Sequence, residues 1–160
     1  MKKLLAIPLI LICLMSSPSL GGDLQKGVVA FQNGDFATAL LEWTPLAEQG
    51  NVSAQSNLGT MYSNGKGVPK DYKTAVKWFT FAAEQGNAIA QSNLGVMYGK
   101  GLGVIQDLIY AHMWLNIAAS NGNEPAVENR KIVAENMTPS QIEKAQDLAR
   151  ECVAKNYKGC

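Results

Sequence analysis

The chain has 160 residues, which is the size of a single domain. Hydrophobic residues make up 47% of it and charged residues 17%, so a packed core is possible and a wholly disordered chain is excluded. The formal net charge is +1, and the lysines and arginines are not clustered as they are in proteins that neutralise phosphates. We therefore expect a folded domain that does not bind nucleic acid.

Residues 1–22 have the layout of a secretory signal peptide. Two lysines near the start precede an apolar run at residues 4–15, and small residues with Pro18 follow it. The apolar run is shorter than the roughly 20 residues that cross a bilayer as a helix. We expect cleavage near Gly21 or Gly22, export to the periplasm or the medium, and no stable membrane insertion afterwards. A retained membrane anchor is the alternative.

Removal of this segment would leave two cysteines, Cys152 and Cys160. An even number of cysteines in an exported chain favours a disulfide. Such a bridge would fold residues 156–159 back onto the last helix, and the chain-entropy estimate gives it about 2–3 kcal/mol. A redox-active pair is the alternative, although the spacing is not Cys-x-x-Cys.

Residues 23–50 predict a short helical hairpin. A helix runs to about Gln32, Asn33-Gly34 makes the turn, and Asp35 caps a second helix. This hairpin precedes the strongest pattern in the chain.

That pattern is an internal repeat with a spacing of 36 residues. Residues 48–62 read EQGNVSAQSNLGTMY and residues 84–98 read EQGNAIAQSNLGVMY, which match at 12 of 15 positions. The same shift pairs further residues: Gly65 with Gly101, Gly67 with Gly103, Asp71 with Asp107, Ala75 with Ala111, and Trp78 with Trp114. The chain therefore contains at least two copies of one structural unit.

Each unit predicts two helices. In the first unit, Ala54, Leu58 and Met61 recur at helical spacing, and Gly65 then ends the helix by adopting positive φ. Asp71 and its counterpart in the second unit are natural caps for the next helix. Gly59 and Gly95 lie inside the first helices, where we expect a neighbouring helix to approach closely. We expect Trp43, Trp78 and Trp114 to be core residues rather than a ligand box.

The C-terminal segment, residues 124–160, departs from the repeat. A helix at 124 to about 136 offers Val127, Ile132 and Val133 for burial. Residues 138–141, Thr-Pro-Ser-Gln, predict a capping box, and a final helix then runs to about Lys155 with one charged face. Such a helix can cover the last apolar surface of a repeat array.

The repeat resembles the Sel-one-like repeat family, which is related to tetratricopeptide repeats but has a longer loop between its helices. The resemblance is carried by the spaced residues Ala54, Leu58-Gly59, Tyr62, Gly65-Lys66-Gly67-Val68, Asp71-Tyr72, Ala75, Trp78, Ala82-Ala83 and Gly86. It implies an all-α, right-handed α-hairpin solenoid of about eight helices. The organisation would be a signal peptide at 1–22, a tetratricopeptide-like hairpin at 23–50, two Sel-one-like repeats at 51–123 and capping helices at 124–160.

Catalytic chemistry has little support in the sequence. The single histidine, His112, lies in a predicted helix, and no cysteine is near enough in sequence to complete a metal set with it. The Gly65-Lys66-Gly67 segment ends a helix instead of opening one after a strand, so it does not predict a phosphate loop. We expect no enzyme activity, no cofactor and no metal.

A binding surface is expected along the first helix of each unit, which lines the concave face of such a solenoid. The stripe opposite Ala54 and Leu58 is small and uncharged, unlike the Lys, Arg and Asn stripe with which tetratricopeptide relatives clamp a peptide carboxylate. It favours contact with backbone or weakly polar surface, although it could equally be solvated surface. The candidate partner-binding residues are Ser53, Ser56, Thr60, Ser63, Ile89, Ser92 and Val96.

The leading hypothesis is an exported, monomeric adaptor that binds another protein or a peptide in this groove. A cell-wall-directed enzyme or small-molecule binder is an alternative, because a cysteine-rich branch of the family resembles penicillin-binding proteins or β-lactamases. This chain lacks the pair of cysteines in each repeat that marks that branch. A structural role in the assembly of an envelope complex is a third possibility.

Overall fold

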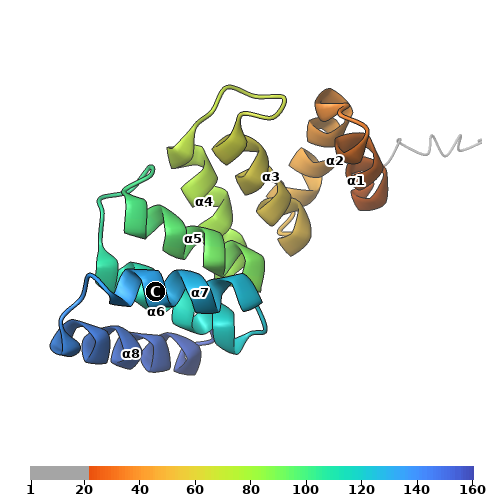
Figure 1. Ribbon diagram of the computed structural model, residues 1–160. Helices are drawn as coiled ribbons and strands as arrows, with labels where there is room; N and C mark the ends of the chain where they lie inside the picture. The colour runs from red at the N-terminus through yellow and green to blue at the C-terminus, as the bar shows by residue number, and fades with distance from the viewer. Residues whose placement is uncertain (1–21) are drawn as a thin grey trace, which may run out of the picture.

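The computed structural model describes residues 22–160, and these residues form eight α-helices and no β-strand (Figure 1). The signal peptide predicted at residues 1–22 lies outside this range, apart from Gly22. The helices are α1 (Leu24–Gln32), α2 (Phe36–Glu48), α3 (Val52–Asn64), α4 (Tyr72–Ala83), α5 (Ala88–Lys100), α6 (Leu108–Ser120), α7 (Glu124–Ala134) and α8 (Pro139–Ala154). Across residues 22–160, no helix combines the length and apolar character that a membrane crossing needs.

The helices begin at the short polar residues that the sequence predicts. Asp35, Asp71 and Asp107 cap α2, α4 and α6, and each carboxylate accepts a hydrogen bond from a backbone N–H in the first turn. Thr138 and Gln141 form the predicted capping box at the start of α8. These bonds satisfy N–H groups that have no partner inside the helix, so the caps define where the helices start.

Glycines end α3 and α5 and shape the long loops that follow. Gly65 and Gly101 have φ angles of 68° and 66°, and Gly67 and Gly103 both have 73°, a region that side chains with a Cβ disfavour. The loop after α3 also packs against the preceding hairpin, because a Cβ on Gly67 would lie 2.5 Å from the Cβ of Phe36. The positive φ predicted at Gly65 is confirmed.

The helices pair in sequence, α1 with α2, α3 with α4 and α5 with α6, and the pairs stack so that α2 contacts α3 and α4 contacts α5 (Figure 1). Each pair packs closely at a glycine of its first helix. A Cβ on Gly59 would lie 2.6 Å from the ring of Phe79, and a Cβ on Gly95 would lie 2.7 Å from Cγ of Leu115. The close helix approach predicted at these two glycines is therefore confirmed.

The bulky residues opposite these glycines correct the interpretation of the tryptophans. Trp43, Phe79 and Leu115 are spaced by 36 residues and occupy equivalent inward positions. Trp43 and Trp114 are buried, as predicted, but Trp78 is only partly buried. The predicted core position of Trp78 is confirmed only in part, because Trp78 packs against the core from a partly exposed position and its neighbour Phe79 takes the buried one.

The repeat frame continues into the C-terminal segment for one more helix. Asn51, Asn87 and Asn123 cap α3, α5 and α7 in the same way, 36 residues apart, and α7 packs on α6 as α5 packs on α4. Ile132, which the sequence offers for burial, is instead 52% exposed. The final helix α8 packs against α6 rather than forming a close pair with α7, and it buries Ala145 and other small residues there.

The C-terminal tail is tied to the body of the protein. The predicted disulfide is present between Cys152 and Cys160. Within the loop that it closes, the hydroxyl of Tyr157 donates to Oδ1 of Asn121 at 3.3 Å. The N–H of Gly159 donates to Oε1 of Glu84 at 3.2 Å. The tail therefore contacts the ends of both α4 and α6.

Buried glutamines connect the successive units. Nε2 of Gln91 donates to the carbonyl of Ala83 at 3.1 Å, and its Oε1 accepts from Nδ2 of Asn121 at 2.9 Å. Gln55, 36 residues earlier, makes the same pair of bonds in the preceding unit. Because these polar groups are buried, the bonds both satisfy them and set how one unit stacks on the next.

Candidate functional site

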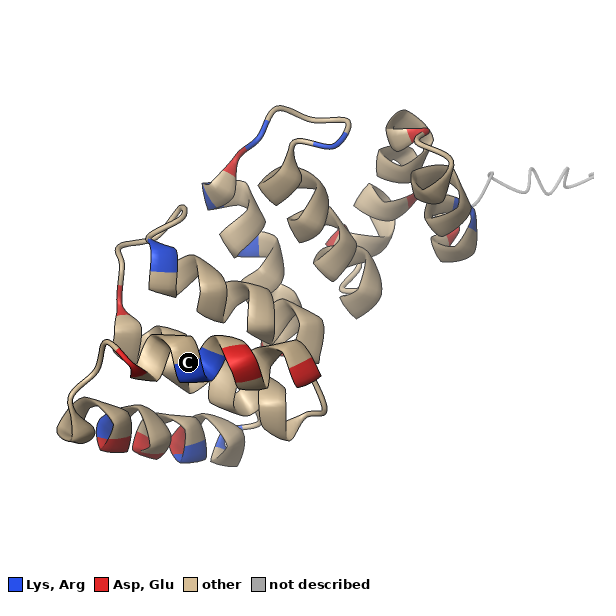
Figure 2. Ribbon diagram, viewed as in Figure 1, with Lys and Arg blue, Asp and Glu red and all other residues tan. Residues whose placement is uncertain are grey.

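The surface formed by α1, α3, α5 and α7 is the candidate binding surface, and we name it the A-helix face. In Figure 1, α3, α5 and α7 follow one another across the molecule, and contacts join α3 to α5 and α5 to α7. Helix α3 has no charged side chain and α5 has only Lys100, whereas α7 and α8 are rich in charge (Figure 2). The central part of the face is therefore almost neutral.

The predicted stripe on α3 is only partly available to a partner. Ser53 is exposed, Thr60 and Ser63 are partly buried, and Ser56 is buried. The hydroxyl of Thr60 donates to the carbonyl of Ser56 at 3.1 Å, and that of Ser63 donates to the carbonyl of Thr60 at 3.0 Å. These two hydroxyl groups thus use their donors on the backbone of their own helix.

The stripe on α5 has the same pattern. Ile89 is 59% exposed and Val96 is partly buried, but Ser92 is buried. Ser56 and Ser92 are only 5% and 8% exposed, so their side chains offer little surface to a partner. Each of these serines follows a buried glutamine. The buried side of each helix is therefore one residue wider than the spacing of its apolar residues predicts.

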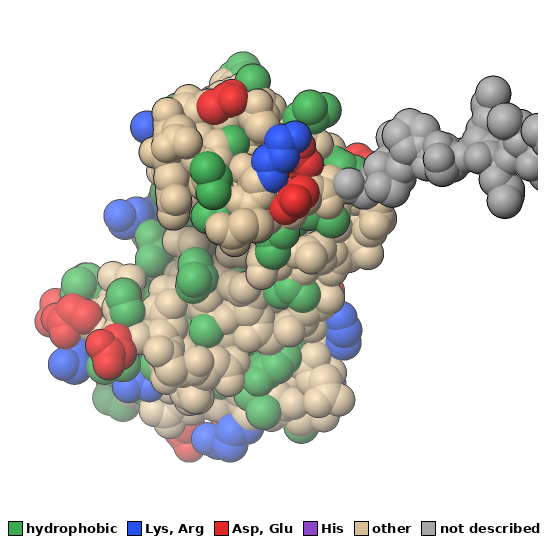
Figure 3. All heavy atoms as spheres, turned by 90° about the vertical axis from the view of Figure 1, so that its right-hand side faces the viewer, with side chains coloured by type: hydrophobic (Ala, Val, Ile, Leu, Met, Phe, Trp, Pro, Cys, Tyr) green, Lys and Arg blue, Asp and Glu red, His purple; other side chains and the backbone are tan. Residues whose placement is uncertain are grey.

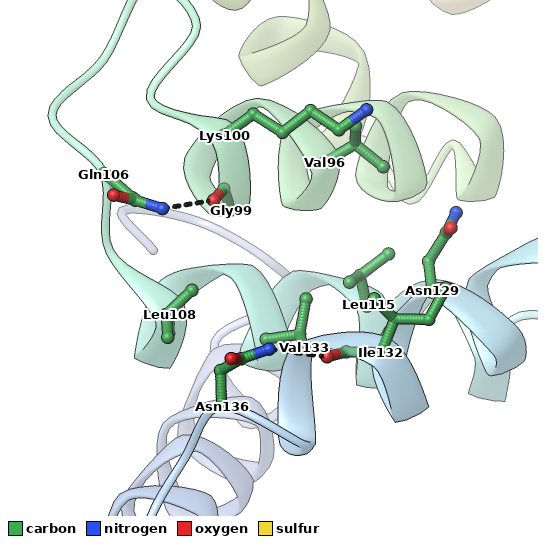
Figure 4. A pocket seen from close by; sticks show the side chains of 10 residues that line it. All are labelled: Val96, Gly99, Lys100, Gln106, Leu108, Leu115, Asn129, Ile132, Val133 and Asn136. Carbon is green, nitrogen blue, oxygen red and sulfur yellow. Dashed lines mark hydrogen bonds between the residues drawn. The ribbon is translucent and has the colours of Figure 1, made fainter.

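A pocket of about 590 Å³ opens on the A-helix face between α5, α6 and α7 (Figure 4). Its apolar wall includes Val96 and Val133, which pack on the buried side chain of Leu115. The exposed side chain of Ile132 lies at its edge. The full lining is Val96, Gly99, Lys100, Gln106, Leu108, Leu115, Asn129, Ile132, Val133 and Asn136.

The polar side chains of this pocket divide into two kinds. Gln106 donates to the carbonyl of Gly99 at 2.8 Å, and Asn136 donates to the carbonyl of Ile132 at 3.4 Å, so both support the backbone (Figure 4). Lys100 and Asn129 make no side-chain hydrogen bond to any group in residues 22–160. Their polar atoms remain available to a bound molecule.

A second, smaller hollow of about 280 Å³ lies between α1 and α3. Trp43 of α2 lines it, just as Leu115 of α6 lines the larger pocket, and these two positions are two repeat spacings apart. Thr60 lies at its edge. Hollows thus form at equivalent places between successive first helices, with a bulky residue of the second helix below.

Three asparagines mark equivalent positions along the A-helix face. Asn57, Asn93 and Asn129 lie on α3, α5 and α7, 36 residues apart, and all three are partly exposed. Among the described residues, their side chains have no hydrogen-bond partner. Sequence reasoning missed them, although two of them stand inside the matched QSNLG segment. The signal that could have found them is that the repeat copies share an asparagine at a position where it caps no helix.

The single histidine of the sequence lines neither of these two pockets. His112 of α6 is 4% exposed, and its Nδ1 has no hydrogen-bond partner in the described part of the chain. Burial lowers the pKa of His112, and the positive charge of Arg130 lowers it further. Nowhere in residues 22–160 do three or more His, Cys, Asp or Glu side chains gather closely enough to hold a metal ion.

Comparisons with known proteins identify the repeat. The family model of the Sel1 repeat matches residues 52–87 and 88–123. None of the curated proteins is similar enough in sequence to match this chain.

Two solved structures share the fold. A protective antigen of uropathogenic Escherichia coli strains with an SLR fold is 32% identical, with a TM-score of 0.76 over 82% of this chain. A Sel1 repeat protein from Oxalobacter formigenes is 28% identical, with a TM-score of 0.68 over 81% of this chain. The chain spans only 30% and 55% of these two proteins. The chain therefore carries two Sel1 repeats, at residues 52–87 and 88–123, within an α-helical solenoid that is similar to these two structures.

Proposed function

We propose that this protein is an exported adaptor that binds an extended segment of another protein on its A-helix face. The observation that carries the proposal is the row formed by Asn57, Asn93 and Asn129, whose carboxamides have no partner within the described residues. A carboxamide both donates and accepts, so it can pair with the N–H and the C=O of a peptide backbone. Such pairing recognises a backbone without selecting its side chains.

The pocket between α5 and α7 supplies the second part of the proposed site. Its volume of about 590 Å³ and its apolar wall suit a large apolar side chain of the bound segment. Lys100 is the only charged residue among those that line it in the described chain. The site therefore fits a mostly uncharged peptide better than a strongly acidic one.

Export is the other half of the proposal. It is supported by the signal-peptide pattern in residues 1–22 and by the disulfide between Cys152 and Cys160, because disulfides persist mainly in oxidising compartments. We also propose that the protein is a monomer whose partner is a different protein.

The test is chemical cross-linking in envelope fractions with three folded variants. Val96→Arg and Thr60→Arg place a charged side chain at the two hollows, and Leu41→Arg makes a matched change at an exposed position of α2. We expect the cross-linked partner to be lost from the first two and kept by Leu41→Arg. A partner that stays with all three variants would refute the A-helix face as the site.

A further inference from the structure

The first two described residues are held tightly against α2. The N–H of Asp23 donates to Oε2 of Glu42 at 2.7 Å. A Cβ on Gly22 would lie 1.7 Å from the backbone carbonyl oxygen of Glu42, so the backbone of Gly22 touches that of α2 and only glycine fits there. The chain therefore becomes anchored at Gly22, at the point where the predicted signal peptide ends.

The charges at this anchor are not balanced by the side chains alone. Glu42 is 9% exposed, and its Oε1 is paired with Nζ of Lys26. Asp23 adds a second carboxylate, which caps α1. The hydrogen bond from Lys26 and then that from the backbone of Asp23 lower the pKa of Glu42, so this carboxylate stays ionised near neutral pH. Two negative groups thus face one positive side chain.

The space-filling view shows the same arrangement on the surface. Acidic and basic side chains gather close to where the described chain begins (Figure 3). An additional positive charge here would make the cluster of Asp23, Lys26 and Glu42 neutral. Two carboxylates lie within reach of such a charge, and they would offset its repulsion from the positive end of α1.

We propose that the bond between Gly21 and Gly22 is the processing site, and that the new α-ammonium group of Gly22 pairs with the carboxylate of Glu42. In this step a leader peptidase adds water across the bond, so that Gly21 keeps the new carboxylate and Gly22 takes the ammonium group. The proposal rests on the export proposed above.

The pattern of small residues favours this bond over the next one, and the geometry is compatible with the proposed pair. Ser19 and Gly21 are small residues at the third and first positions before it, which is the pattern that leader peptidases require. Cleavage one residue later would place Leu20 at the third position. The nitrogen of Gly22 is three bonds from that of Asp23, which puts it within about 6 Å of the Glu42 carboxylate.

The processing site is tested by the intact mass and N-terminal sequence of protein recovered from the exported fraction. We expect the chain to start at Gly22. A chain that is exported but starts at another residue would overturn this inference and leave export standing. A chain that keeps residues 1–21, or is absent from the exported fraction, would contradict export itself.

The ammonium–carboxylate pair is tested on chains that start at Gly22, with a free or an acetylated α-amino group. At neutral pH we expect acetylation to lower the Tm by about 2–4 °C. In Glu42→Gln the two forms should melt together, whereas Glu48→Gln, which changes an exposed carboxylate at the end of the same helix, should keep the difference. Equal melting of the free and acetylated wild-type chains would overturn the pairing.

Discussion

Gly59 of α3 lies against the ring of Phe79 of α4, with room for no more than a hydrogen at its Cα. Replacement by alanine usually stabilises a helix by about 1 kcal/mol. Here the added methyl group would lie 2.6 Å from the ring, and such overpacking costs about 1–3 kcal/mol. We predict that Gly59→Ala lowers the free energy of unfolding by up to about 2 kcal/mol, as measured by urea denaturation.

Gly99 provides the matched control for this prediction. It lies in α5, and a Cβ there would be 3.5 Å from that of Ala111, an ordinary contact. Gly99→Ala should therefore be neutral or slightly stabilising. If both variants changed stability equally, helix propensity rather than packing would account for the effect.

The buried amide of Gln91 should be necessary for the stacking of the units. Its loss in Gln91→Ala would leave the carbonyl of Ala83 and the amide of Asn121 without this partner, which costs about 1–3 kcal/mol. We predict a loss of stability of that size in urea denaturation. Gln146→Ala, an exposed change on α8, should leave the midpoint within about 0.5 kcal/mol of wild type, and a similar loss there would argue against the network.

The features of the fold that could be predicted from the sequence are the local ones. The caps at Asp71 and Asp107 and the turn at Gly65 act locally, so residue type alone located them. Burial of Gln91 and Ser92 could not be predicted in this way, because a polar residue on a helix is normally taken as exposed. Their environment depends on a neighbouring helix whose position only the fold defines.

The candidate site was predictable to a similar extent. Repetition predicted a candidate binding face on α3 and α5, where Ile89 is exposed and Val96 is partly buried. The pocket beside Val96 also needs α7, which the sequence pattern assigned to a separate cap. The contribution of Ile132 and Asn129 was therefore visible only once α7 was seen to continue the repeat.

The C-terminal disulfide should stabilise the last helix. Cys160→Ser removes the bridge and leaves the buried Cys152 in place. The chain-entropy estimate predicts a loss of about 2–3 kcal/mol in the free energy of unfolding. Hydrogen exchange should show the loss first around α8 and Tyr157. Wild-type protein with and without a reductant is the control, and no difference between these two samples would contradict a stabilising bridge.

His112 should make the protein less stable in mild acid. Burial lowers its folded-state pKa below the ordinary value of 6.5, so below that value the unfolded chain binds a proton that the folded chain resists. The stability contributed by neutral His112 is thus fully present above about pH 6.5 and is lost as the pH falls through the lowered pKa. His112→Gln should show a smaller drop in unfolding midpoint between about pH 7.5 and pH 5 than wild type. Equal drops would exclude His112 as the cause.

The most direct test of the A-helix face uses a photo-reactive amino acid at Ile132 or at Val153. Both are exposed aliphatic positions, but Ile132 lines the pocket beside α5 and Val153 lies on α8. After irradiation of envelope preparations, we predict a cross-link to a protein partner from position 132, its loss on addition of Val96→Arg, and no cross-link to that partner from position 153. A cross-link from position 153 alone, or one from position 132 that survives Val96→Arg, would contradict binding on this face.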